Sequence, residues 1–113
     1  VKVVCPEYIG LIISGEIVVN SFYRERDRLI EKSILSYINV VNMEMGKPLH
    51  FGDLFGMIDN LDYVSYTNKL YITPIGNYIE KTVSEDIIVP PNGIYYVKEI
   101  NLNYLKSSEI YND

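Results

Sequence analysis

The sequence has one cysteine, Cys5, and no tryptophan. A single cysteine cannot form a disulfide within the chain, which excludes a small secreted domain stapled by several disulfides. The only histidine, His50, has no second histidine, no cysteine and no acidic partner at a spacing that suits a metal site. We therefore expect no metal and no cofactor. We interpret His50 as a turn or helix-cap residue, and Cys5 as a buried or domain-junction residue.

Long hydrophobic runs and an excess of positive charge are also missing. The most apolar stretch is interrupted by Glu7, Glu16 and Asn20, whereas a membrane-spanning helix needs about 20 apolar residues. Lys and Arg number 10 against 15 Asp and Glu, and the net charge is −5. Proteins that bind nucleic acids present basic surfaces. We expect a soluble domain with neither a membrane nor a nucleic acid as partner.

Catalytic motifs are missing as well. The sequence has no glycine-rich phosphate loop and no Ser–His pattern, and its later carboxylates show no metal-ligand or acid–base spacing. The carboxylates in question are Asp53, Asp59, Asp62, Glu80, Glu85 and Asp86. We expect no enzymatic activity and no small-molecule substrate.

What the sequence contains is the material for one α+β domain. Its 113 residues, 48% of them hydrophobic, can build a modest core. Apolar residues at every second position of residues 8–19 predict a long strand with one buried face. Gly10 and Gly15 inside that strand indicate a bulge or a close approach of another backbone.

Two helices are predicted next. From Asn20 or Ser21, which can cap a helix, apolar residues recur at spacings of three and four until about residue 41 or 42. The predicted stripe consists of Leu29, Ile30, Ile34, Tyr37, Ile38 and Val41. Gly46 suits a left-handed helix C-cap ahead of Pro48. A shorter helix is expected over residues 51–61.

The remaining residues return to a period of two. Strands are expected at residues 63–72, 87–89 and 94–104, with turns at 73–77 and 90–93. In the last strand we expect one face to carry Ile94, Tyr96, Ile100 and Leu102 together with Lys98, and the other Tyr95, Val97 and Glu99.

The order of these elements predicts the fold class and the domain organisation. Consecutive helices and short later turns favour an α+β fold in which two consecutive helices pack on one face of a mostly antiparallel sheet. We expect residues 1–113 to be a single domain and a fragment of a longer chain. Residues 1–5 would form the junction to a preceding domain, and residues 106–113 a frayed tail.

Several short segments, in order, carry a resemblance to a known family. They are Val18-Val19, Ser36-Tyr37-Ile38-Asn39, Gly46, Leu61-Asp62-Tyr63-Val64, Asp86-Ile87-Ile88-Val89-Pro90 and Asn92-Gly93. From Ile9 to Tyr104 the chain resembles the C-terminal region of the baseplate J-like proteins, which build the wedges of contractile phage tails and related injection machines.

The resemblance implies a structural module of a bacteriophage tail baseplate, assembled through protein–protein contacts. The partners it implies are other baseplate wedge proteins and copies of the same chain. The location it implies is the virion tail baseplate, after synthesis in the bacterial cytoplasm. It implies no catalytic residue.

Tyrosine is unusually abundant, with 11 residues. Tyrosine buries a large ring and keeps a polar tip, and it is enriched at protein interfaces. The candidate interface residues are Tyr66, Tyr71, Tyr95, Tyr96, Arg24 and Arg28. Tyr95 is expected to be exposed. A half-exposed sheet face and a solvated helix turn, neither with a binding role, remain open alternatives. A small domain that binds a ligand or peptide on a tyrosine-rich sheet face is the alternative function.

Overall fold

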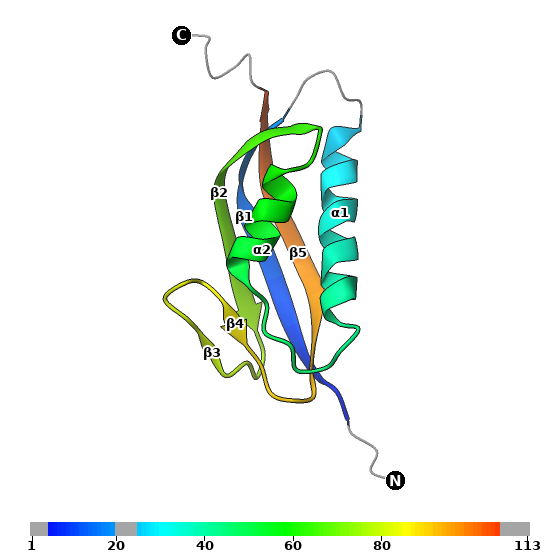
Figure 1. Cartoon of the computed structure of the whole chain (residues 1–113), viewed down its shortest axis with the longest axis vertical. Coiled ribbons are helices and arrows are strands. Elements are labelled where there is room, and N and C mark those ends of the chain that lie inside the picture. The colour runs from blue at the N-terminus through cyan, green and yellow to red at the C-terminus, as the bar shows by residue number, and fades with distance from the viewer. Residues whose placement is uncertain (1–4, 20–24, 107–113) are drawn as a thin grey trace.

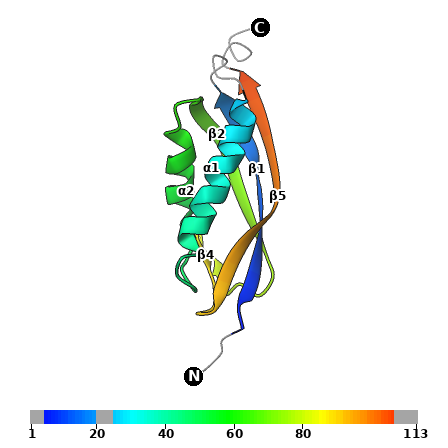
Figure 2. The same cartoon turned by 90° about the vertical axis from the view of Figure 1, so that its right-hand side faces the viewer.

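A long central strand organises the structure, a computed structural model that describes residues 5–19 and 25–106. The elements in chain order are β1 (Glu7–Val19), α1 (Arg26–Val41), α2 (Phe51–Asp59), β2 (Val64–Ile75), β3 (Glu80–Lys81), β4 (Ile87–Ile88) and β5 (Gly93–Lys106). β1 lies between β2 and β5 in a three-stranded sheet, while β3 and β4 pair separately (Figure 1). Both helices cover the same face of the larger sheet (Figure 2). The predicted α+β fold with two helices on one face is confirmed.

The sheet is mixed in direction. β1 is antiparallel to β2, and β3 is antiparallel to β4. β5, however, runs parallel to β1 over its whole length. The short turns of the sequence did not predict this parallel pair, because β5 crosses to the far edge of β1 instead of returning beside β2.

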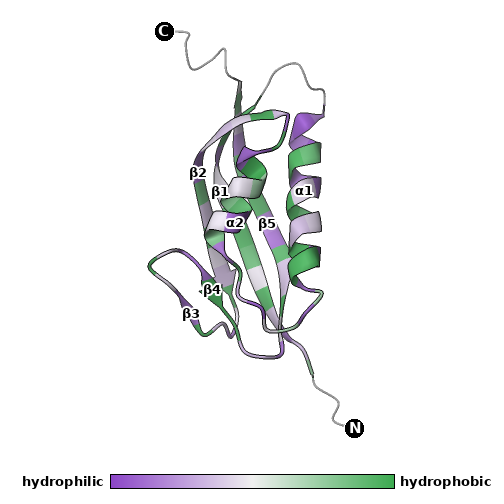
Figure 3. Cartoon of the chain, in the orientation of Figure 1, coloured by the Kyte–Doolittle hydropathy of each residue, from purple (hydrophilic) through white to green (hydrophobic). Residues whose placement is uncertain are grey.

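The core lies between the sheet and the helices. From β1 it receives five fully buried side chains: Ile9, Leu11, Ile13, Ile17 and Val19. The helices add Ile30, Ile34 and Ile38 from α1, and Leu54 and Ile58 from α2. Figure 3 shows hydrophobic segments along β1 and on both helices. The buried face predicted for α1 is confirmed for its isoleucines, but Leu29 is 37% exposed, because a spacing of four leaves only a narrow stripe against the sheet.

A bulge in β5 decides which of its residues face the core. Leu11 pairs with Val97, but the next residue, Ile12, pairs with Glu99, so that Lys98 is the extra residue. Before the bulge Tyr95 and Val97 pack on the core. After the bulge Ile100, Leu102 and Tyr104 do so. The single face predicted for Ile94, Tyr96, Ile100 and Leu102 was wrong, since one inserted residue reverses the alternation of a strand.

Several predicted boundaries are shifted. α2 ends at Asp59, not near residue 61. β2 continues through Pro74 to Ile75, which an edge strand tolerates because the N–H that proline lacks need not be paired there. Lys106 ends β5 and is not part of a tail. The expected caps Asn20 and Ser21, and residues 1–4 and 107–113, lie outside the described residues.

Two residues near chain turns differ from their sequence interpretation. Gly46 is left-handed, with φ 78°, but α1 ends earlier, at Val41. Gly46 instead brings the connection against β5, where its N–H donates to the carbonyl of Gly93 at 2.9 Å. Cys5 is exposed, so of its two interpretations the buried residue was wrong and the domain-junction residue stays a prediction.

Both glycines of β1 occupy crowded positions, but the predicted close approach of another backbone is confirmed only at Gly15. Gly15 has φ +149°, and a Cβ built there would lie 2.1 Å from the carbonyl oxygen of Lys69 on β2. A Cβ on Gly10 would lie 2.8 Å from the hydroxyl oxygen of Tyr96. β1 therefore approaches both of its neighbouring strands at positions without a side chain.

Candidate functional site

The sheet face that the helices leave uncovered carries exposed tyrosines from all three strands. Tyr8 is 60% exposed, Tyr71 53%, Tyr96 44% and Tyr66 42%. These are large rigid side chains with a polar tip, the type that protein interfaces favour.

The register of the sheet shows that these tyrosines share one face. Tyr71 pairs with Ser14 and Tyr96 pairs with Gly10. Tyr66 pairs with Val18 in the same way. Alternate residues of a strand point to opposite faces, and the odd-numbered residues of β1 from Ile9 to Val19, Gly15 apart, are core residues. The even-numbered residues of β1 and their tyrosine partners therefore point away from the helices. Among them Val18, the partner of Tyr66, is fully buried, so the exposed part of this face extends from Tyr8 to Glu16 on β1.

The centre of this uncovered face is polar. A shallow hollow of about 330 Å³ is lined by Ser14, Gly15, Glu16, Lys69, Tyr71, Asn101 and Asn103. Beside it, the Asn68 side-chain amide donates to the Glu16 carboxylate at 2.9 Å. Glu16 also pairs in register with Lys69, and Glu99, the partner of Ile12, adds a second carboxylate to this face. Such a surface can bind through ring contacts and hydrogen bonds.

Tyr95 was predicted to be an exposed interface residue, and this prediction was wrong. Tyr95 is only 3% exposed. Its hydroxyl donates to the Lys47 carbonyl, and its backbone N–H and carbonyl both bind the Asn42 side chain, at 2.8 and 2.6 Å. Burial raises the pKa of Tyr95 to about 12. Tyr95 precedes the bulge of β5 and so points into the core, where it ties β5 to the end of α1.

The arginines predicted for the interface do not join the tyrosines. Arg28 is exposed on α1, and α1 packs on the opposite face of the sheet (Figure 2). Arg24 lies outside the described residues. The candidate surface that remains therefore combines the predicted Tyr66, Tyr71 and Tyr96 with Tyr8, which sequence reasoning missed although it alternates with the apolar residues of the first strand.

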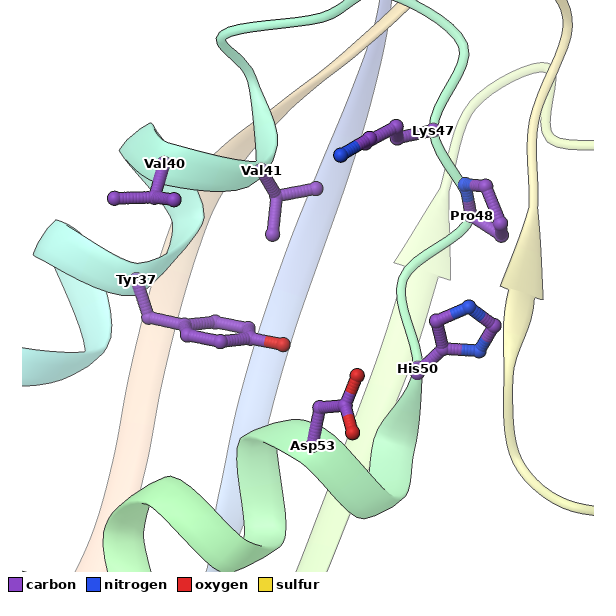
Figure 4. Close-up of a pocket in the computed structure, with 7 residues that line it drawn as sticks. All are labelled: Tyr37, Val40, Val41, Lys47, Pro48, His50 and Asp53. Carbon is purple, nitrogen blue, oxygen red and sulfur yellow. The ribbon is translucent and has the colours of Figure 1, made fainter.

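A second hollow lies on the helical side of the molecule (Figure 4). It has a volume of about 290 Å³ and is lined by Tyr37, Val40, Val41, Lys47, Pro48, His50 and Asp53. Partial burial of Tyr37 and the nearby charge of Asp53 raise the pKa of the phenol. No sequence motif predicted this pocket, because its walls come from the end of α1, the connection between the helices and the first turn of α2.

His50 lies at the N-cap position of α2, as interpreted from the sequence. Its side chain does not cap the helix. Instead, Asp86 accepts a hydrogen bond from the Phe51 N–H at 2.9 Å and lies 3.3 Å from Nδ1 of His50. The hydrogen bond from the Phe51 N–H lowers the pKa of Asp86 most, and the hydrogen bond from His50 lowers this pKa further. Among the described residues, no group of three or more His, Cys, Asp or Glu side chains could hold a metal ion.

The role of Asp86 predicts a pH-dependent effect of Asp86→Asn. Because folding lowers the pKa of Asp86 from 3.8, the ionised carboxylate stabilises the folded state above that pH, and this contribution is lost as the pH falls through the folded-state pKa. Asp86→Asn should therefore lower the urea midpoint at pH 7, with a difference from the wild type that shrinks toward pH 3. The exposed Asp62, changed to Asn, is the control and should show a smaller effect. A difference for Asp86→Asn that is the same at both pH values would contradict the capping role.

Comparison of the sequence with models of known protein families and with curated proteins finds no match. Within the described residues, no helix is both long enough and apolar enough to cross a membrane.

Proposed function

We propose that this chain is a structural assembly module of a contractile tail baseplate, in a phage or a phage-like injection machine, and that it acts through protein–protein contacts without catalysis. The observation that carries the mode of action is the uncovered sheet face with Tyr8, Tyr66, Tyr71 and Tyr96 exposed. The assignment to a contractile tail baseplate rests on the resemblance of residues 9–104 to the C-terminal region of the baseplate J-like proteins. Its partners would be other wedge proteins and further copies of the chain.

The dimensions of the uncovered face suit a protein partner. Its strands have 12 to 14 residues, which at about 3.3 Å per residue gives a length of roughly 40 Å. Three strands with their side chains are roughly 15 Å wide, so the face covers roughly 600 Å². A standard interface buries about 800 Å² on each partner. The sheet face could thus supply most of one such interface.

The composition of the face supports the same mode of action. The exposed tyrosine rings, with Tyr71 beside the central hollow, can be buried by a flat partner. The asparagines and charged side chains that line the hollow can exchange hydrogen bonds with water for hydrogen bonds with the partner. The second candidate function, binding of a peptide or small ligand, is favoured by the hollow of about 330 Å³ on the same face.

Co-purification tests the assembly function. The full-length gene product, expressed together with the products of its neighbouring genes, should enter a complex of defined mass, measured by light scattering and viewed by electron microscopy. A protein that stays monomeric beside every such product would contradict the proposal.

A charge on the tyrosine face tests the surface itself. Tyr71→Lys should weaken the complex by about tenfold or more if Tyr71 is a central contact, without lowering the urea midpoint of the isolated chain. Tyr78→Lys is the matched control, because Tyr78 is also exposed, at 39%, but lies between β2 and β3, outside the three-stranded sheet. Equal binding by both variants would exclude this face as the contact.

A further inference from the structure

The pocket between the helices joins an apolar wall to polar groups at its edge. Val40, Val41, Pro48 and the ring of Tyr37 form the wall. Val40 is 62% exposed, so apolar surface is open to solvent here. The pocket volume of about 290 Å³ lies near the lower limit for small-molecule sites, which range from about 300 to 1,000 Å³. A ligand well below drug size fits this volume.

Among the described residues, the fold leaves two polar groups of this pocket without a partner and holds a third in a long, solvent-exposed ion pair. The Asp53 carboxylate and the Tyr37 hydroxyl make no hydrogen bond or ion pair with any residue of 5–19 or 25–106. The Lys47 ammonium lies 3.8 Å from Glu44, and these two side chains are 55% and 73% exposed. Figure 4 shows the Tyr37 hydroxyl and the Asp53 carboxylate directed into the same space, with Lys47 extending toward Val41 from the other side.

The two charges of the pocket restrict the chemistry of its ligand. A carboxylate such as Asp53 attracts an ammonium group, and an ammonium such as Lys47 attracts a carboxylate. A neutral apolar molecule would desolvate the Asp53 carboxylate without pairing it, and would leave Lys47 only its long, exposed contact with Glu44. A ligand with one charge would pair with one of them and oppose the other. Only a ligand with both charges satisfies both, and the apolar wall then requires an apolar substituent.

We propose that this pocket binds a small zwitterion with an apolar side chain, in chemical terms a free apolar α-amino acid such as leucine or methionine. Asp53 and the Tyr37 hydroxyl receive its ammonium group, Lys47 receives its carboxylate, and the side chain lies on Val40, Val41 and Pro48. The pocket is on the helical side of the sheet, opposite the tyrosine face, so the ligand and the proposed assembly partner would occupy different surfaces.

The test uses L-leucine and two analogues, titrated into the isotope-labelled chain and followed by NMR. Leucine should cause saturable shifts at Tyr37 and Val41 with a dissociation constant of about 1 mM or tighter. Leucinamide lacks the carboxylate and resembles the first residue of a peptide. N-acetyl-leucine lacks the ammonium and resembles the last residue of a peptide. Both should bind about tenfold more weakly than leucine, because each loses one charged hydrogen bond.

Substitutions then assign the two charges. Asp53→Asn should lower the affinity for leucine about tenfold but leave the affinity for N-acetyl-leucine unchanged. Lys47→Met should lower the affinity for leucine about tenfold but leave the affinity for leucinamide unchanged. Lys98→Met and Asp62→Asn, exposed changes away from the pocket, should have no effect. The proposal is overturned if leucine gives no saturable shifts, if either analogue binds as tightly as leucine, or if neither pocket variant weakens leucine.

Discussion

Replacement of Ile34 by alanine is expected to lower the free energy of unfolding by about 2–4 kcal/mol. Ile34 is fully buried between Ile30 and Ile38 on the stripe that α1 packs against the sheet. The change removes apolar contacts and leaves a cavity that a helix lying on a sheet can close only in part. A domain has a total stability of about 5–15 kcal/mol, so the loss is a large share of it.

The neighbouring residue is a matched control for this substitution. Leu35 is 44% exposed, and Leu35→Ala should cost well under about 1 kcal/mol, as surface changes usually do. Both variants remove methyl-bearing carbons from adjacent positions of the same helix. Urea unfolding followed by circular dichroism measures the difference. Equal midpoints would show that the buried face of α1 has been assigned incorrectly.

Gly15→Ala is expected to destabilise the chain at least as much as Ile34→Ala, by lowering the free energy of unfolding by about 3 kcal/mol or more. Alanine rarely adopts the positive φ of this residue, and its Cβ would lie 2.1 Å from the backbone oxygen of Lys69. A backbone atom cannot rotate away as a side chain can, so β1 and β2 would have to separate locally. Urea midpoints of the variant and the wild type measure this loss.

The same chemical change should have the opposite sign at Gly56. A Cβ built on Gly56 meets nothing within 4 Å, and Gly56 lies in α2, where alanine is favoured over glycine by about 1 kcal/mol. Gly56→Ala should therefore raise the urea midpoint. If Gly15→Ala were as stable as the wild type, the close approach of β1 to β2 would be wrong.

The candidate surface was partly predictable from the sequence. Tyr66, Tyr71 and Tyr96 were named as interface residues and are exposed, but Tyr95 is not. Tyr95 and Tyr96 are adjacent and chemically identical, so composition cannot distinguish them. Their burial depends on which face the helices cover and on the bulge at Lys98, both of which are set by contacts between distant parts of the chain.

The pocket between the helices could not be predicted in the same way. Tyr37, Lys47 and Asp53 are separated in sequence and belong to two helices and their connection. The apolar spacing of α1 assigned Tyr37 and Val41 to a buried stripe. Both are only partly buried, because the connection between the helices leaves a gap beside them, and no local pattern records the path of that connection.

The sequence by itself determined the fold class, the places of the main strands and both helices, and the buried isoleucines of α1. These features follow from periodicity, which is a local property: side chains four apart share a helix face, and side chains two apart share a strand face. Only the tertiary structure decided that β5 pairs parallel with β1, that the bulge reverses its faces, and that Asp86 caps α2. Each of these features depends on hydrogen bonds between groups that are far apart in the chain. The spacing of neighbouring residues does not determine which distant groups form those bonds.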